Sequence, residues 1–479
     1  MNIKIETLFH QATGLNAEEL NALPLSGSIR KYFRVFSNND TVIACYNANY
    51  KENLSFIRFT EHFLSKGLAV PKILGNFPDE NIYFLEDLGD TTLFNLIEIE
   101  KEAGTFSQNL INLYKSVIDH LLLFQIKGRE GFDFSIAYPR AKFDKQSMLW
   151  DLNYFKHYFI KLAGVPFDEQ ELEDDFSVFS DYLLQAGNTF FLYRDFQSRN
   201  IMIKEGKLYF IDYQGGRQGA LQYDLASLLW DAKAGIPQDL RNLLLEHYLD
   251  RLSHYISFDR EEFKNLYYPF VLIRIMQACG AYGYRGFFER KQHFLLSIPN
   301  ALSNLKWITE NIHLKIKIPA LMRIFELLIN SPGLQEFHYQ PKTGLTVQLR
   351  SFSYKRSVPL DNSGNGGGFV FDCRFLPNPG REEAFRELTG NDPAVIEYLD
   401  SKDEVRIFMD HVKCIIDQAV KNYLERKFTN LMISFGCTGG RHRSVYCANH
   451  LHAYLQKYKD MNLEIRHIEQ EIVQKEAKA

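Results

Sequence analysis

The stretch Leu192–Gln214 holds two aspartates and an asparagine at a spacing suited to phosphoryl transfer. Asp195 precedes Asn200, and Asp212 follows after the apolar runs IMI and LYFI, which are separated by the turn-like KEGK. This pattern predicts a β-hairpin between Asn200 and Asp212. An aspartate on a tight loop can accept the proton of an acceptor hydroxyl, and asparagine and aspartate supply the hard oxygen ligands that Mg²⁺ prefers. The residues therefore favour Asp195 as a base, with Asn200 and Asp212 on the metal.

The chain around this site changes character from strands to helices. Residues 25–100 read as strands and turns, in which LSGSIRKYFRVF and TVIACYN form a strand pair. From Ser107 to about Trp307, apolar residues recur at helical spacing, as in FSQNLINLYKSVIDHLLLFQI. The Asp195 loop and its hairpin fall inside this helical region.

A second pattern begins near Leu345. The strands LTVQLRSFSY and GGFVFDCRFL precede a long amphipathic helix, the buried strand NLMISFGC and a last helix, and the segment after Met461 reads as a frayed helix. KIPALMRIFELLINSPG reads as one amphipathic helix that joins the two patterns. These features predict an α+β domain over residues 1–312, a connecting helix and linker over 313–344, and an α/β domain over 345–479.

The stretch SFGCTGGRHRSV (434–445) predicts an anion site. A strand end, a glycine-rich turn and a helix start present free backbone N–H groups and the positive end of the helix to a ligand. Arg441, His442 and Arg443 add cations, and Thr438 and Ser444 add hydroxyls around Gly439 and Gly440. The GK[ST] ending of a Walker A motif is missing. Cys437 and Arg443 have the C-x₅-R spacing of phosphate-cleaving cysteine enzymes, but phosphatase chemistry is not the favoured interpretation.

Composition narrows the class of protein. The 479 residues predict two or three domains, and 46% hydrophobic with 24% charged residues is typical of globular proteins. The net charge of −4 argues against wholesale nucleic-acid binding. The sequence shows no signal peptide and no apolar run long enough to span a bilayer. The six cysteines are scattered without a CxxC pair, which favours free thiols in a reducing cytoplasm. No membrane partner is expected, because no apolar run could span a bilayer.

The first pattern resembles the protein-kinase-like fold in its aminoglycoside phosphotransferase branch. The resemblance rests on D-x-x-x-x-N followed by an apolar I-D, and it covers roughly residues 20–310. It implies a bilobal α+β domain that uses ATP and Mg²⁺. Asp224, in QYDLASLL, stands where the branch has an aspartate that braces the catalytic loop.

The resemblance extends to the expected nucleotide site. LSGSIRKYFRV resembles the nucleotide-covering hairpin, in which Ser26, Gly27 and Ser28 offer backbone N–H groups to phosphate. FLEDLGD resembles the hinge that contacts adenine through its backbone around Glu86 and Leu88. One departure concerns the third strand, TVIACYN, which lacks the usual phosphate-binding lysine. Lys51, Arg30 and Lys31 are the candidate replacements.

Within this branch, RDFQSRNIMI and YDLASLLWD most resemble the cell-wall amino-sugar kinases. These enzymes phosphorylate the anomeric hydroxyl of N-acetylmuramate or N-acetylglucosamine. Gln197 stands where histidine is usual, and MLWDLNYFKHYFI (148–160) resembles their substrate-side helix. The resemblance implies an amino sugar as the acceptor.

The second pattern closely resembles the C-terminal domain of the RNase adapter protein RapZ, which senses an amino-sugar phosphate and binds a small RNA. The segments SFSYKRSVP, FVFDCRFLPNP, ELTGNDPAVIEYL and GCTGGRHRSV carry this likeness. Residues that fall on its ligand-pocket motifs are Asp372, Thr438, Gly439, His442 and Arg443. Gly380-Arg381 replaces the family's usual His-Trp, and the tail after Met461 is not basic. A phosphorylated sugar is therefore the expected partner, and RNA is disfavoured.

Three readings of function follow. The leading hypothesis is a fusion of an amino-sugar kinase with a phosphosugar-binding regulatory domain. The second is a pseudokinase adapter that binds a metabolite or RNA, favoured by the missing strand lysine and disfavoured by the intact Asp195–Asn200–Asp212 set. The third is an antibiotic kinase, for which the acidic run FDEQELEDD (167–175) would attract a polycationic substrate, although such a run more often forms a solvated helix face.

Overall fold

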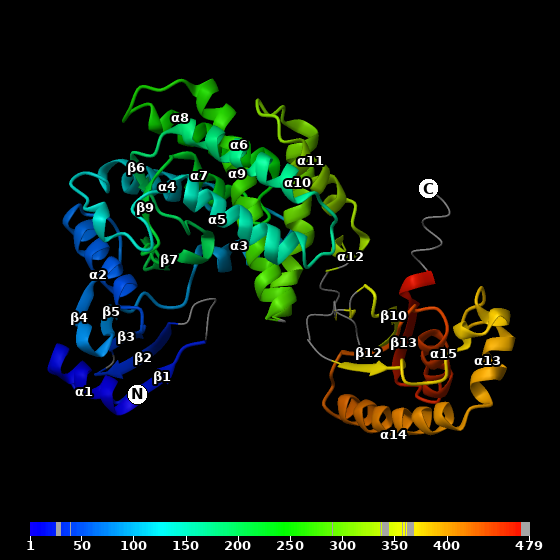
Figure 1. Ribbon diagram of the computed structural model, residues 1–479. Coiled ribbons are helices and arrows are strands. Elements are labelled where there is room, and N and C mark those ends of the chain that lie inside the picture. Colours follow the sequence, from blue (N-terminus) through cyan, green and yellow to red (C-terminus); the bar gives the residue numbers. More distant parts are fainter. Residues whose placement is uncertain are drawn as a thin grey trace. The chain divides into compact units, whose positions relative to one another are not determined.

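The computed structural model describes residues 1–470 except 25–29, 39, 290, 336, 338–343, 357, 360 and 362–367. The chain forms two compact units. One comprises Met1–Gly283 and Asn300–Ser331, and the other Tyr284–Pro299 and Pro332–Ala479. The first unit is drawn in blue to green and most of the second in yellow to red (Figure 1).

The N-terminal lobe of the first unit is an antiparallel sheet with strand order β1-β2-β3-β5-β4. Its strands are β1 (Glu19–Ala22), β2 (Lys31–Ser37), β3 (Asp40–Tyr46), β4 (Ile73–Phe77) and β5 (Ile82–Glu86). The predicted pairing of the second and third strands is confirmed, since Val35 lies opposite Val42. Helix α1 (Asn2–Thr13) buries Ile5 and Phe9 against one face of this sheet. Helix α2 (Tyr50–Ser65) begins at Asn49, whose side chain accepts the Glu52 N–H.

The C-terminal lobe of the same unit is mainly helical, as the sequence predicts. Its helices are α3 (Leu93–Glu102), α4 (Gln108–Leu122), α5 (Lys145–Phe155), α6 (Glu169–Leu183), α7 (Gln222–Leu229), α8 (Gln238–Leu252), α9 (Arg260–Tyr282), α10 (Ile298–Asn311) and α11 (Pro319–Ile329). The central helix α9 packs against α5 and α7 (Figure 1). Its side chains Phe270–Met276 are all buried.

Two small antiparallel pairs lie in this helical lobe and carry the Asp195 loop. β6 (Phe190–Leu192) pairs with β9 (Arg217–Gly219), and β7 (Ile201–Lys204) pairs with β8 (Lys207–Phe210). The predicted hairpin between Asn200 and Asp212 is therefore confirmed. The chain enters the site from β6 and leaves it towards β9.

Helix α11, predicted from the sequence as a connecting helix, lies within the first unit. It packs against α6, where the carboxylate of Asp175 accepts the Leu321 N–H at 2.8 Å. Pro319 occupies the first turn of α11, where its missing N–H costs no helical hydrogen bond. The short helix α12 (Pro332–Gln335) follows and belongs to the second unit.

The second unit contains a parallel four-stranded sheet with strand order β11-β12-β10-β13. Its strands are β10 (Leu345–Ser353), β11 (Gly368–Asp372), β12 (Asn430–Cys437) and β13 (Met461–His467). Its helices after β11 are α13 (Pro393–Asp400), α14 (Asp403–Glu425) and α15 (Arg443–Leu455). All eight residues of β12 are buried, as expected for a central parallel strand.

The prediction of a frayed helix after Met461 is wrong. The segment forms the edge strand β13, in parallel register with β10. Met461, Leu463 and Ile465 alternate along it and pack against the core of the domain. This period of two is the strand signal, and the mixed charges of the tail obscured it.

No described helix is long and apolar enough to cross a membrane. The six cysteines are all free, and only Cys414 is exposed.

Candidate active site

The loop that carries Asp195 is anchored through its backbone. The carboxylate of Asp224, in the first turn of α7, accepts the N–H groups of Tyr193 and Arg194 at 2.7 and 2.9 Å. Asp224 is fully buried, and burial raises the pKa of its carboxyl group to about 7, against the lowering effect of the two N–H donors. Asp224 thus lies where the sequence analysis expects a bracing residue.

Arg194 holds the other side of the same loop. Its guanidinium donates to both carboxylate oxygens of Asp151 on α5, at 2.8 and 2.6 Å, and lies over the rings of Phe143 and Tyr223. The backbone of Arg194 has a φ of 83°, a costly conformation that this bidentate pair helps to fix. The adjacent Asp195 side chain remains 40% exposed and open to a substrate.

Asn200 and Asp212 converge on Asp195. The amide of Asn200 donates to the backbone oxygen of Asp195 at 2.9 Å and to the carboxylate of Asp212 at 3.3 Å. Gln214 holds the other oxygen of Asp212 at 2.7 Å, and Asp212 has a φ of 68°. Burial and the neighbouring charge of Asp195 raise the pKa of Asp212. This concentration of negative charge is the setting that a divalent cation would neutralise.

The donor set fits Mg²⁺ in the manner of a phosphotransferase. No group of three or more His, Cys, Asp and Glu side chains in the described part of the chain is arranged to hold a metal. Asp212 and Asn200 supply one carboxylate and one amide, and Mg²⁺ commonly takes few protein ligands and completes its octahedron with substrate phosphates and water. Asn200 commits its nitrogen to Asp195 and Asp212, which leaves its oxygen as the ligand atom.

A buried arginine lies where the third-strand lysine is missing. Arg30, directly before β2, is 3% exposed and pairs with Glu52 of α2 at 2.5 Å and with Asp212 at 3.5 Å. Lys31 and Lys51, the other candidates, are both exposed. Of the three candidate replacements, Arg30 is thus the one that is buried and faces Asp212, held by the Glu52 carboxylate on α2.

The expected hinge is held by two cations. Lys204 of β7 donates to the Glu86 carboxylate at 3.1 Å and to the Asp87 backbone oxygen at 2.9 Å. Arg34 of β2 donates to Asp87 at 2.6 and 3.1 Å. Glu86 is half-buried at the end of β5, and Leu88 is buried after it. The predicted phosphate-contacting residues Ser26, Gly27 and Ser28 lie outside the described residues.

Several residues of this site are not predicted from the sequence. Besides Asp151 and Gln214, Arg217 follows the glycine pair at the start of β9, and Arg274 lies in the middle of α9. Arg274 carries the clearest signal, because a charged residue interrupts the apolar run FVLIRIM. Asp151 gives no local signal, since only the fold brings α5 to the Asp195 loop.

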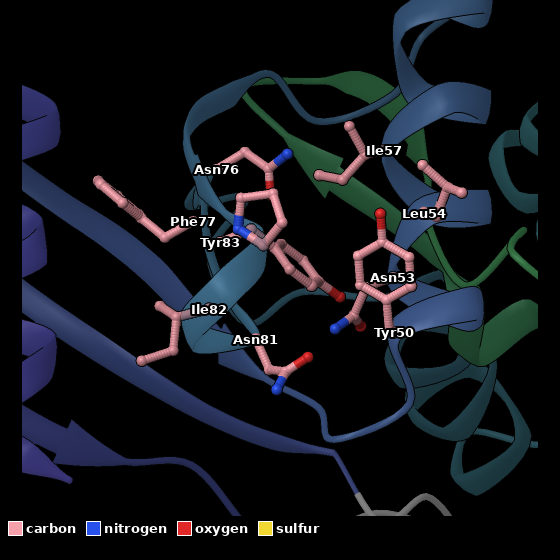
Figure 2. Close-up of a pocket in the computed structure, with 10 residues that line it drawn as sticks. Tyr50, Asn53, Leu54, Ile57, Asn76, Phe77, Asn81, Ile82 and Tyr83 are labelled. Carbon is pink, nitrogen blue, oxygen red and sulfur yellow. The ribbon is translucent and has the colours of Figure 1, made fainter.

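A pocket on the strand lobe is separate from this site. It lies between the start of α2 and the β4–β5 turn, and its lining includes Tyr50, Asn53 and Tyr83 (Figure 2). The lining contains tyrosine hydroxyls and amides but no carboxylate, histidine or cation. It therefore holds no group suited to phosphoryl transfer.

In the second unit, the glycine-rich turn joins β12 to α15. Thr438 and Gly439 are exposed, and Gly440 has a φ of 66°, which favours glycine. Cys437 is buried, with its sulfur 3.2 Å from the hydroxyl of Ser444. The turn lies at the carboxyl end of a parallel sheet, where such folds bind ligands.

The charged residues near this turn are held by the protein itself. Arg443 is buried and donates from one nitrogen to the backbone oxygens of Arg374 and Leu376, at 2.7 and 2.9 Å. His442 bonds the Phe385 oxygen at 2.9 Å, and Asp372 pairs with Arg374 at 2.6 Å. The guanidinium of Arg443 thus ties the loop after β11 to the start of α15.

This role predicts a loss of stability on truncation. Arg443→Ala should lower the free energy of unfolding of the second unit by about 2–4 kcal/mol, because two backbone oxygens lose their donor. Hydrogen exchange of the β12 amides would measure it, with the exposed Arg406→Ala on α14 as the control. Equal protection in both variants would show that Arg443 does not hold the loop.

Known protein families match two separate parts of the chain. Residues 24–264, just over half of the sequence, match the phosphotransferase enzyme family, and the chain belongs to this family. Residues 345–471 match the RapZ C-terminal domain. The predicted fold class, a kinase-like bilobal α+β domain followed by a RapZ C-terminal-like α/β domain, is confirmed.

Curated relatives match about a quarter to a third of the chain. A nucleotide-binding protein of Thermoanaerobacter sp. (strain X514) is 40% identical over 124 residues, which cover 26% of this chain and 42% of that protein. One from Xanthomonas oryzae pv. oryzae (strain PXO99A) is 33% identical over 162 residues, which cover 33% of this chain and 55% of that protein. The matched segment thus spans about half the length of these relatives.

Solved structures resemble the chain more distantly. An ethanolamine kinase of Plasmodium vivax has a TM-score of 0.43 at 14% identity, covering 60% of this chain and 82% of its own. A choline kinase of Streptococcus pneumoniae has a TM-score of 0.42 at 15% identity, covering 65% of this chain and 100% of its own.

Proposed function

We propose that this protein is an ATP- and Mg²⁺-dependent kinase that phosphorylates an amino sugar. The observation that carries the proposal is the convergence of Asp195, Asn200 and Asp212 on a loop that Asp224 and Arg194 brace from two sides. The family match supports phosphotransfer. The amino sugar, N-acetylmuramate or N-acetylglucosamine at its anomeric hydroxyl, rests on the resemblance of the loop sequences.

Each residue of the site has a distinct role in the proposed reaction. Asp195, exposed at the loop, accepts the proton of the acceptor hydroxyl and orients its oxygen for in-line attack. Asp212 and the Asn200 oxygen would hold Mg²⁺, which would supply positive charge to neutralise the transferred phosphoryl group. The backbone around Glu86 and Leu88 receives the adenine. In the second unit, the turn at Thr438 and Gly439 offers N–H groups to a phosphorylated sugar that regulates the kinase.

Arg30 replaces the missing lysine in this scheme. Arg30→Ala should raise the KM for ATP about tenfold or more, because the strand lobe loses its buried cation and Glu52 and Asp212 lose their partner. Arg30→Lys should recover part of the loss, whereas the exposed Lys51→Ala should leave the KM unchanged. Initial rates measured at varied ATP concentrations give the KM for each variant. An unchanged KM in Arg30→Ala would show that Arg30 does not contribute to nucleotide binding.

Two alternatives make different predictions. A pseudokinase adapter would show no Asp195-dependent turnover and would act through the second unit alone. An antibiotic kinase would use the acidic run of residues 167–175, but Glu169 and Glu173 pair with Lys156, and Asp175 accepts the Leu321 N–H. These carboxylates serve the packing of α6.

The experiment is a measurement of ADP release with ATP, Mg²⁺ and a panel of N-acetylmuramate, N-acetylglucosamine, glucosamine and kanamycin. The proposal expects sugar-dependent ADP release that Asp195→Ala abolishes. Release with kanamycin alone would support the antibiotic kinase. No release with any member would support the adapter.

A further inference from the structure

The pocket on the strand lobe borders the helix that carries Glu52. Tyr50, Asn53, Leu54 and Ile57 line it from α2, and the β4–β5 turn forms its other side (Figure 2). The lining is mostly apolar and has no charged group, so a charged ligand would lose its hydration without gaining a counter-ion. Tyr50, the first residue of α2, is 53% exposed and offers its ring to a ligand. The pocket therefore suits an uncharged molecule with an apolar ring.

One polar atom of the lining lacks a partner. Asn53 is nine-tenths buried, and its Oδ1 accepts no hydrogen bond from any described residue. Its Nδ2 is already committed, because it donates to the Asn47 backbone oxygen at 2.7 Å. A buried amide oxygen without a donor is costly to a fold, and the cost is recovered when a donor enters. The ligand that fits this pocket therefore carries an O–H or N–H donor.

The same asparagine connects the pocket to the candidate active site through Asn47. The backbone oxygen of Asn47 accepts from Asn53, and its backbone N–H donates to the oxygen of Asn81, which also lines the pocket, at 3.2 Å. The side-chain Nδ2 of Asn47 donates to the Glu52 carboxylate at 2.9 Å. Glu52 in turn pairs with the buried Arg30. Two asparagines of the pocket thus hold the residue that positions Glu52.

A stack of aromatic rings makes a second connection between the two sites. Tyr83, which lines the pocket from β5, stacks on Phe56 of α2 with ring centroids 5.1 Å apart. Phe56 also stacks on Tyr213 at 5.2 Å, and Tyr213 directly follows Asp212 in the chain. Because close-packed rings transmit displacement, a shift of α2 would be felt at Asp212.

We propose that this pocket is a regulatory site for a small uncharged aromatic molecule that carries an O–H or N–H donor. The ligand donates to the Asn53 oxygen, which polarises the amide and strengthens its hydrogen bond to Asn47. Glu52 is then held more firmly against Arg30, and the nucleotide binds more tightly because the cation is already in place. Ligand binding depends on the pocket alone, whereas the effect on the nucleotide rests on the proposed kinase function.

Ligand binding is tested on the full chain with four probes, which are benzyl alcohol, benzyl methyl ether, benzoate and benzylammonium. Ligand-observed NMR titrations give the Kd of each probe. We expect a Kd of about 1–10 mM for benzyl alcohol, and binding at least about tenfold weaker for the two ions and for the ether, which has no donor. Tyr50→Ala should weaken the binding of benzyl alcohol about fivefold or more. Tyr255→Ala, at another exposed tyrosine, is the matched control.

The effect on the nucleotide is tested by calorimetric titration of ATP·Mg²⁺ with and without benzyl alcohol at several times its Kd. We expect the affinity for ATP to rise about fivefold, and ATP to raise the affinity for benzyl alcohol by the same factor. Asn47→Ala should still bind benzyl alcohol but lose this effect, because its side chain no longer reaches Glu52. Tyr50→Ala should lose the effect at the same probe concentration while keeping the basal affinity for ATP.

Other results would overturn the inference. If no probe binds, if either ion binds as well as benzyl alcohol, or if Tyr50→Ala binds like the wild type, the pocket is not the proposed site. If the ether binds equally well, the Asn53 oxygen is not the acceptor. If benzyl alcohol binds and leaves the affinity for ATP unchanged, the pocket does not regulate the nucleotide site. If ATP itself does not bind, the proposed function fails, while the ligand class of the pocket is decided by the four probes.

Discussion

Replacing Asp195 with asparagine is expected to lower kcat for sugar phosphorylation by about 10²–10⁴-fold. Asparagine has nearly the same shape but cannot accept the hydroxyl proton. The loop should keep its position, because Asp224 holds it through backbone N–H groups and Arg194 pairs with Asp151. Affinity for ATP·Mg²⁺ should therefore change little, and calorimetric titration of the nucleotide measures it beside the rate.

The prediction is specific because kcat should fall while the affinity for ATP·Mg²⁺ stays nearly unchanged. A matched control is Asp181→Asn on α6, whose exposed carboxylate pairs with Lys145 and should leave both quantities unchanged. If Asp195→Asn retains more than about a tenth of the wild-type kcat, Asp195 is not the proton acceptor.

Replacing Asp212 with asparagine is expected to lower kcat by about 10²-fold or more and to raise the half-saturating Mg²⁺ concentration. The substitution removes the carboxylate that we propose as the metal ligand and that Arg30 contacts at 3.5 Å. Stability should not fall, because Asp195 and burial disfavour the charge of Asp212 in the apo protein, and asparagine tolerates the φ of 68° at this position.

A magnesium titration of the rate, with the melting temperature measured in parallel, checks both parts. Asp250→Asn, on the exposed side of α8, serves as the control. Loss of activity together with an unaltered magnesium requirement would place Asp212 outside the metal site. A sharp drop in melting temperature without metal would show a structural role.

The sequence contains enough local information for the hairpin and the strand pair. The apolar runs on either side of the turn-like KEGK are short, and KYFRVFS has a period of two. Both features predict strands, and both segments form strands in the structure. The tail after Met461 has the same alternation, but its polar residues on the solvent side and its edge position hid it. Its pairing with β10 is a long-range contact that no local pattern reveals.

The same limit applies to the site. Asp195, Asn200 and Asp212 are close in the chain, so their spacing is enough to predict that they lie together in the structure. Arg30 and Arg274 are far from them in sequence and reach them only after the sheet and α9 are packed. The sequence also places Arg443 beside a glycine-rich turn, but it does not reveal that one nitrogen of its guanidinium donates to two backbone oxygens.

The most direct test of the account is mass spectrometry of the acceptor after reaction with ATP whose γ-phosphate carries ¹⁸O. Wild type and Asp195→Asn are incubated with Mg²⁺ and N-acetylmuramate. We expect the wild type to add one labelled phosphate to the sugar and the variant to add almost none. An unmodified sugar with the wild type, or equal labelling with both proteins, would contradict it.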